Sequence, residues 1–61
     1  MSYEIAEYKY INHMKDRYGL IGEIEYPSRT HSAEDYEGNW LLVSPKGIKM
    51  GKVFKNGDII A

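Results

Sequence analysis

The 61-residue chain contains no cysteine. This absence excludes disulfide bonds and zinc sites built on thiolates. Domains shorter than about 70 to 80 residues commonly gain stability from disulfides, a structural metal or a partner subunit. Without disulfides, we expect a single domain, residues 1–61, that depends on close packing or on association with another chain.

Long apolar runs are also lacking. No stretch of about 18 apolar residues occurs that could form a membrane helix. The N-terminal stretch MSYEIAEYKYI is acidic and rich in tyrosine, whereas a signal peptide begins with basic residues and continues with apolar ones. We therefore predict no membrane partner and a soluble protein of the cytoplasm, a compartment with which the absence of cysteine agrees.

Arginine does not occur beyond Arg29, and the charge is unevenly distributed. Residues 1–38 carry four Lys or Arg against eight Asp or Glu, a net charge of −4. Residues 39–61 carry four Lys against one Asp, a net charge of +3. Either part could recognise a partner of opposite charge, or the two parts could complement each other.

Residues 2–18 have the spacing of an amphipathic helix. At about 100° per residue the apolar side chains gather on one side of this segment. Ser2 is suited to cap the first turn, and Gly19 is suited to end the last one. The apolar side is expected to hold Tyr3, Ala6, Tyr10, Ile11, Met14 and Tyr18.

Beyond Gly19 the apolar period shortens to about two residues, which is typical of strands. We predict strands at about 20–26, 39–44, 48–55 and 58–61, with a long polar loop at 27–38. The sequence therefore predicts an α+β domain in which an N-terminal helix packs on a three- or four-stranded antiparallel meander.

Two tight turns are predicted in the C-terminal part. Residues 44–47, SPKG, have the composition of a type I turn. The dipeptide Asn-Gly at 56–57 predicts a two-residue hairpin loop. A loop of that length pairs Lys55 with Asp58 and Phe54 with Ile59.

The stretch WLLVSPKGIKMGKVFKNGDI resembles the C-terminal part of SH3-like small barrels. The residues at matching places are Gly38, Asn39, Trp40, Val43, Gly47, Gly51 and Val53. The resemblance covers residues 38–60, with one extra residue between Gly47 and Gly51, and a helix replaces the family's first strand and ligand loop. It implies an alternative fold, a partly open SH3-like barrel with an N-terminal helix, and a binding module in which Trp40 helps to form a groove.

Lysine recurs at every third position, as Lys46, Lys49, Lys52 and Lys55. In a regular strand this spacing splits the lysines between two faces, but a bulge at Gly51 would bring Lys49 and Lys52 to one side. We interpret the lysines as solubilising residues. The alternative is binding of single-stranded nucleic acid or RNA by Lys49, Lys52 and Lys55, with Phe54 or Trp40 stacking on bases.

A catalytic or metal site is not predicted. GIKMGKV has three residues between its glycines where a nucleotide-hydrolase phosphate loop has four. His31 lies near Ser32, Glu34 and Asp35 in one polar loop, which offers no scaffold to align a nucleophile with a base. The same loop lacks the spacing of known metal motifs. We expect no enzyme activity, no metal and no cofactor.

Six tyrosines and one tryptophan exceed what so small a core can bury, and these residues are favoured at protein interfaces. We therefore predict a non-enzymatic protein that binds another protein as regulator, adaptor or inhibitor, of a size typical of phage or mobile-element accessory proteins. Trp40 could instead be a core residue, as we expect for Tyr10 and Tyr18. The candidate contact residues are Tyr8, His31, Glu34, Asp35, Tyr36, Glu37 and Trp40.

A third hypothesis is self-assembly. The last residues, DIIA at 58–61, form a short apolar strand that could complete the sheet of a neighbouring copy. The simplest product of such pairing is a homodimer.

Overall fold

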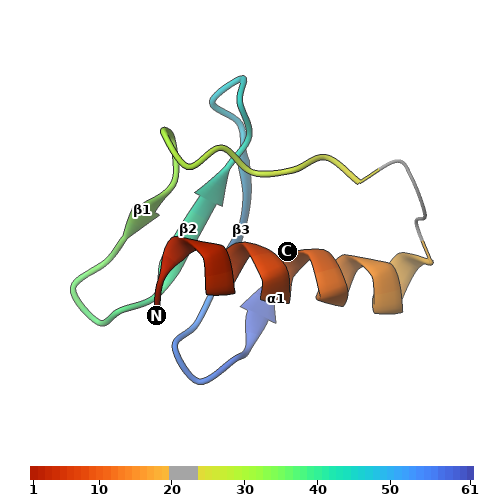
Figure 1. Cartoon of the computed structure of the whole chain (residues 1–61), viewed down its shortest axis with the longest axis horizontal. Helices are drawn as coiled ribbons and strands as arrows, with labels where there is room; N and C mark the ends of the chain where they lie inside the picture. The colour runs from red at the N-terminus through yellow and green to blue at the C-terminus, as the bar shows by residue number, and fades with distance from the viewer. Residues whose placement is uncertain (20–23) are drawn as a thin grey trace.

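The structure is a computed structural model that describes residues 1–19 and 24–61. Helix α1, Tyr3–Tyr18, is followed by strands β1, Ala33–Glu34, β2, Trp40–Val43, β3, Lys49–Val53, and β4, Ile59–Ile60. The strands are antiparallel and lie in the order β1-β2-β3-β4, with the helix along one face of the sheet (Figure 1). The predicted α+β architecture is confirmed, with four strands.

The helix begins and ends where the sequence predicts. Ser2 has an extended backbone, and its Oγ accepts a hydrogen bond of 3.3 Å from the backbone N–H of Ile5. Gly19 adopts the left-handed conformation with φ 60°, and its N–H donates to the carbonyl of Lys15 at 2.9 Å. Both ends therefore satisfy backbone groups that a helix terminus otherwise leaves free.

The inner side of α1 supplies most of the core. Tyr3, Ala6, Tyr10 and Ile11 are buried, and they meet Leu42 and Val53 of the sheet, which are both 0% exposed. Tyr18 is 54% exposed, so its predicted burial is wrong. The last turns of α1 extend past the strands (Figure 1), so the apolar side of the helix is longer than the sheet that covers it.

All three hairpins use the same three-residue turn. Asp35, Ser44 and Phe54 each accept a hydrogen bond from the N–H of the residue three places on, which is a glycine in every case. These glycines, at positions 38, 47 and 57, have φ of 84°, 82° and 100°. A type I turn followed by one left-handed residue is the common form of a three-residue hairpin.

The last hairpin therefore differs from the prediction. Its ends are joined by a bond of 2.8 Å from the N–H of Phe54 to the carbonyl of Asp58, and Val53 pairs with Ile59. A two-residue type I′ loop needs positive φ at both central residues, and Asn56 does not have it. The loop is one residue longer than predicted, so the predicted pairing of Lys55 with Asp58 is wrong.

A bulge interrupts the β2–β3 ladder. Leu42 pairs with Gly51 and Val43 pairs with Lys49, so Met50 is the additional residue of β3. The predicted bulge exists one residue before Gly51. It resets the alternation of side chains, as bulges do, and leaves Lys49 and Lys52 on the same face of the sheet.

The segment before β1 departs most from the prediction. Residues 24–26 form no strand, and the rest of the predicted strand 20–26 lies outside the described residues. Conversely, β1 lies within the predicted loop 27–38. The segment is held by isolated contacts: the hydroxyl of Tyr3 lies 2.9 Å from the carbonyl of Pro27, and the N–H of Ser28 donates to the carbonyl of Val43 at 2.7 Å. Single bonds of this kind do not make a ladder.

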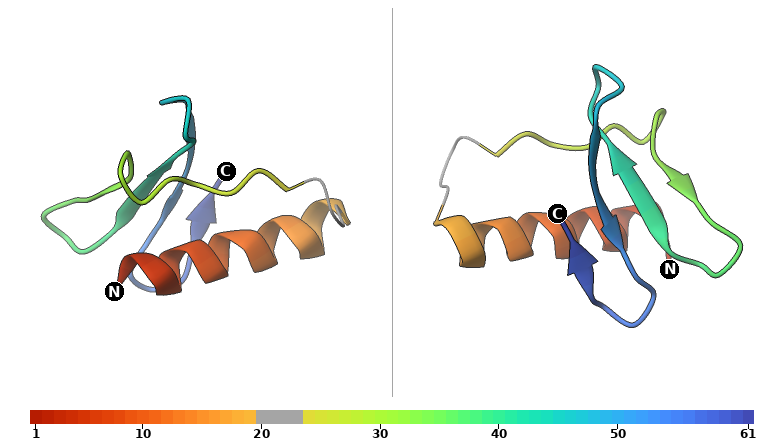
Figure 2. Two further views of the ribbon diagram at one scale, coloured as in Figure 1. Left: turned by 45° about the horizontal axis from the view of Figure 1, so that its top comes forward. Right: turned by 180° about the vertical axis from the view of Figure 1, so that it is seen from behind.

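The sheet is open. Strands β1 and β4 lie at opposite edges, and the described residues do not close the sheet into a barrel. The alternative of an SH3-like partly open barrel is therefore not observed. Helix α1 and the segment 24–32 lie on one side of the sheet, and no described element crosses the other side (Figure 2).

Candidate protein-binding hairpin

The β1–β2 hairpin presents the central part of the predicted binding loop. Its turn comprises Tyr36, Glu37 and Gly38, between Asp35 and Asn39. The N–H of Asp35 donates to the carbonyl of Asn39 at 2.8 Å, and the N–H of Gly38 donates to the carbonyl of Asp35 at 3.2 Å. The stretch that the sequence predicts to be a polar loop is an ordered turn at this point.

The carboxylate of Asp35 holds the turn together. Its Oδ1 accepts hydrogen bonds of 2.9 Å from the backbone N–H groups of Glu37 and Asn39. Its Oδ2 accepts from the side-chain amide of Asn39 at 3.1 Å and lies 3.3 Å from Nζ of Lys52. The backbone bond from Asn39 is the main cause that lowers the pKa of Asp35 from 3.8 to about 2.

Asn39 connects this turn to the next part of the sheet. Its residue exposure is only 4%, and its Oδ1 accepts a hydrogen bond of 2.9 Å from the backbone N–H of Lys55. The amide therefore bonds to Asp35 on one side and to the β3–β4 turn on the other. Two neighbouring turns are thus fixed relative to each other by one buried side chain.

Asp35 gives the stability a specific pH dependence. Because its pKa is lower in the folded chain than the ordinary 3.8, the ionised carboxylate stabilises the fold above that value. This contribution is lost as the pH falls from 3.8 towards about 2. We expect the difference in unfolding free energy between wild type and Asp35→Asn to be largest above pH of about 5 and to shrink on acidification.

Urea unfolding at a series of pH values measures this difference. Glu37→Gln is the matched control, because it removes a charge from the same turn and leaves the bonds of Asp35 in place. Parallel pH profiles for wild type and Asp35→Asn would show that the carboxylate does not hold the turn.

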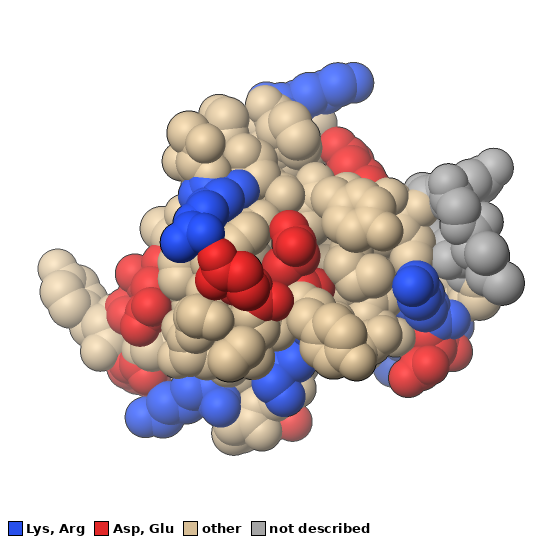
Figure 3. Space-filling model, viewed as in Figure 1, with Lys and Arg blue, Asp and Glu red and all other residues tan. Residues whose placement is uncertain are grey.

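Three of the predicted contact residues project from this hairpin. Tyr36 is fully exposed, at 110% of its reference area, and Glu34 and Glu37 are also exposed. Acidic side chains gather on the left of the face in Figure 3, the side on which Figure 1 places this hairpin and the start of α1. The tip therefore combines one free aromatic ring with negative charge.

The remaining predicted contact residues lie elsewhere. Trp40 packs against the core: its ring meets Tyr3 edge to face at 5.6 Å between centroids, and its indole N–H donates to the carbonyl of Met1 at 2.8 Å. Tyr8 is 69% exposed and lies on α1. His31 is exposed in the preceding turn, where its Nδ1 lies 3.0 Å from Oγ of Ser28.

The lysines of the nucleic-acid alternative are only partly brought together. Lys49 and Lys52 share one face through the bulge, and Nζ of Lys52 lies 5.1 Å from the ring centroid of Phe54. Lys52 is, however, already paired with Asp35. Lys55 lies in the turn after β3, beyond the strand.

The sequence reasoning missed the structural role of Asp35 and Asn39. It took Asp35 for a surface charge, whereas three hydrogen bonds to its carboxylate make it part of the turn. A usable signal was present, because Asp readily bonds to backbone N–H groups shortly after it and a turn glycine follows three residues later.

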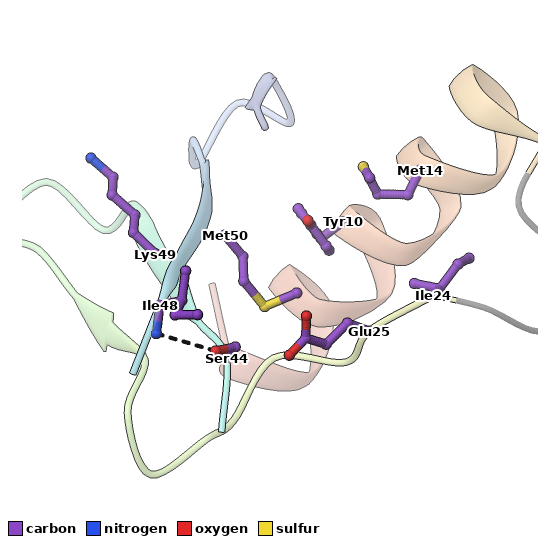
Figure 4. A pocket seen from close by; sticks show the side chains of 8 residues that line it. All are labelled: Tyr10, Met14, Ile24, Glu25, Ser44, Ile48, Lys49 and Met50. Carbon is purple, nitrogen blue, oxygen red and sulfur yellow. Dashed lines mark hydrogen bonds between the residues drawn. The ribbon is translucent and has the colours of Figure 1, made fainter. Parts of the chain in front are cut away.

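A second surface feature is a hollow of ≈ 280 Å³ between α1, residues 24–25 and the β2–β3 hairpin (Figure 4). Burial raises the pKa of the Tyr10 phenol, so this hydroxyl stays neutral at physiological pH. Lys49 points away from the hollow (Figure 4). The site is therefore an apolar depression without an activated nucleophile, lined by Tyr10, Met14, Ile24, Glu25, Ser44, Ile48, Lys49 and Met50.

Within residues 1–19 and 24–61, no group of three or more His, Asp or Glu is placed to hold a metal ion. No helix in those ranges is long and apolar enough to cross a membrane.

No family model, curated protein or solved structure matches the chain.

Proposed function

We propose that this is a non-enzymatic binding protein that engages a protein partner, as regulator, adaptor or inhibitor, through the β1–β2 hairpin. One observation carries the proposal: the ring of Tyr36 is fully exposed on a turn that is held by backbone N–H groups donating to the carboxylate of Asp35. An aromatic ring left in water contributes nothing to the fold, since it buries no area.

The rigidity of the turn supports binding. Tyrosine offers a large contact area with only two side-chain torsions to fix, and a preorganised backbone lowers the entropy that binding costs. The bonds of Asp35 and Asn39 fix the backbone on both sides of Tyr36 before any partner arrives. The hairpin therefore has the properties of an anchor that enters a pocket on the partner.

The charge near the anchor indicates the chemistry of the partner. Glu34 and Glu37 are exposed beside Tyr36. The basic residue next to the turn is Lys55, whose Cδ would lie 3.9 Å from a Cβ placed at Gly38. Acidic groups at the rim of an interface mainly speed the encounter with a basic surface. We propose a partner with a pocket for an aromatic ring, surrounded by lysine or arginine.

The test is affinity capture with matched variants. Tyr36→Ala is expected to weaken binding of the captured partner about 30-fold, the effect of a hot-spot residue worth about 2 kcal/mol. Glu34→Lys with Glu37→Lys is expected to slow association and to reduce its salt dependence. Both variants should melt like wild type, because these side chains are exposed. Asp35 stays unchanged, since its replacement would disturb the turn itself.

The controls decide between the hairpin and other surfaces. Tyr26→Ala removes another exposed tyrosine, 58% exposed, from a different segment and should leave binding unchanged. A partner that binds wild type and Tyr36→Ala equally would refute the role of the hairpin. Capture that disappears on nuclease treatment would instead favour the nucleic-acid alternative.

A further inference from the structure

The side of the sheet away from α1 has an unusual composition for a surface. Leu41 and Val43 are half-buried there, although no described element covers them (Figure 2). Residues paired across an antiparallel ladder lie on the same face, so the pairs Leu41 with Lys52, Val43 with Lys49 and Lys52 with Ile60 define it. We call this surface the open face; it comprises Leu41, Val43, Lys49, Lys52, Phe54 and Ile60.

We propose that the open face is the interface of a symmetric homodimer. Its centre, on β2, is aliphatic, and Ile60 of β4 is 61% exposed. Phe54 continues the apolar surface past the end of β3, beneath the ammonium group of Lys52. An apolar centre with charged residues around it is the usual arrangement of a protein interface.

The charges on the open face favour a second copy over a polyanion. Lys49 and Lys52 are offset by Asp35, whose carboxylate reaches the same face and lies 3.3 Å from Nζ of Lys52. These three side chains together carry a net charge of only +1, and Asp58, opposite Phe54 in the last hairpin, adds a further negative charge. Strong binding of nucleic acid needs several free cations, whereas two copies with charges of both signs can approach without large repulsion.

Symmetry makes these charges complementary. A two-fold axis that runs along the strands, over β2, reverses the strand order in the second copy. The β1 side of one copy, which ends in Asp35, then lies over the β3 side of the other, which carries Lys49 and Lys52. The aliphatic residues of β2 meet their own equivalents at the axis.

The size of the open face limits the surface area that the dimer can bury. The four strands lie about 4.8 Å apart, and the longest, β3, has five residues, so the face covers less than roughly 20 × 17 Å. This area is less than the roughly 800 Å² per partner of a standard interface. We therefore expect a weak dimer, with a dissociation constant of about 10 to 100 µM.

Pairing through the sheet edges is disfavoured by the same geometry. Strands β1 and β4 are each two residues long, so an added strand would find few backbone partners. Short edge strands are a common protection against such pairing. The strand Ile59–Ile60 is therefore too short to complete a neighbour's sheet.

Sedimentation equilibrium from about 10 µM to about 1 mM tests the association. The average mass should rise from 7.1 kDa towards twice that value. Nitrogen-15 amide shifts recorded over the same dilution should change in β2 and β3 and stay constant on the outer side of α1. A chain that remains monomeric throughout, or shift changes centred on α1, would overturn the proposal.

Variants locate the interface. Leu41→Gln, close to the axis, should weaken association at least tenfold. Lys49→Glu should also weaken it, because the new carboxylate would face the acidic β1 side of the second copy, and Lys49 is exposed enough for the fold to stay intact. Ile5→Gln, which alters a residue that is 49% exposed on α1, should leave association unchanged. A labelled oligothymidine of about 12 nucleotides is added as a probe. Its binding to monomeric wild type, with loss in Lys49→Ala, would make the open face a nucleic-acid surface and refute the dimer.

Discussion

Leu42→Ala is expected to lower the free energy of unfolding by about 3 kcal/mol. Leu42 is 0% exposed and lies in the core between α1 and the sheet, so the substitution removes three buried carbon atoms and leaves a cavity. A domain of 61 residues has a total stability of only about 3 to 9 kcal/mol. The variant should therefore unfold at much lower urea concentration, or be largely unfolded without urea.

Leu41→Ala is the matched control for this prediction. It removes the same atoms from the next residue of β2, which is half-buried on the open face. At a concentration where the chain is monomeric, its cost should be about 1 kcal/mol, the typical effect of a substitution away from the core. Equal losses for the two variants would show that the faces of β2 are assigned wrongly.

Gly51→Ala is expected to cost about 2 kcal/mol through overpacking. A Cβ atom at this position would lie 2.6 Å from the carbonyl oxygen of Ile60, 3.1 Å from Cα of Ala61 and 3.2 Å from Cε1 of Tyr10. Two of these atoms belong to the backbone, so no side-chain rotation relieves the clash. Strand β4 or helix α1 must move away from β3 to make room.

Gly47→Ala is the control that separates the steric clash from the general effect of replacing a glycine by alanine. Gly47 has φ +82°, and a Cβ there would meet nothing within 4 Å. Its replacement should cost about 1 kcal/mol, the strain of a left-handed backbone. Thermal melts of both variants measure the comparison. A Gly51→Ala protein as stable as Gly47→Ala would mean that Ile60, Ala61 and Tyr10 do not approach Gly51 as closely as described.

The helix was predictable because its signals are local. Ser2 and Gly19 act within one turn of the helix ends, and the apolar spacing needs no knowledge of the sheet. The exposure of Tyr18 was not predictable by the same means. Whether an apolar position at the end of a helix is covered depends on how far the sheet extends, which is a tertiary property.

Pairing within the sheet was harder to predict than its strands. β2 and β3 lie within the predicted strands 39–44 and 48–55, and β4 lies within 58–61. The predicted register of the β3–β4 hairpin was wrong by one residue, because the dipeptide at 56–57 suits both a two-residue loop and a longer one. The backbone conformation of Asn56 decides between them, and residue type alone does not determine it.

The candidate site was predictable in composition and not in geometry. Exposed acidic and aromatic residues near position 36 follow from the polarity of the stretch 27–38. The hydrogen bonds that fix these residues do not follow from the sequence. The side chain of Asn39, for example, bonds to the backbone of Lys55, which is 16 residues away. Strand β1 was also not predicted, because a strand of two residues is too short to show an alternation of apolar and polar side chains.

The repeated three-residue turn has a consequence for the order in which the chain assembles. Every paired residue of the sheet lies at most 13 positions from its partner, as Trp40 does from Val53. The loop-closure entropy of the sheet is therefore small, and low contact order accompanies fast folding. The contacts of α1 with the rest of the chain are more distant in sequence, since the ring of Tyr3 meets that of Trp40, 37 positions away. We therefore expect the meander to form first from neighbouring segments and the helix to dock on it later.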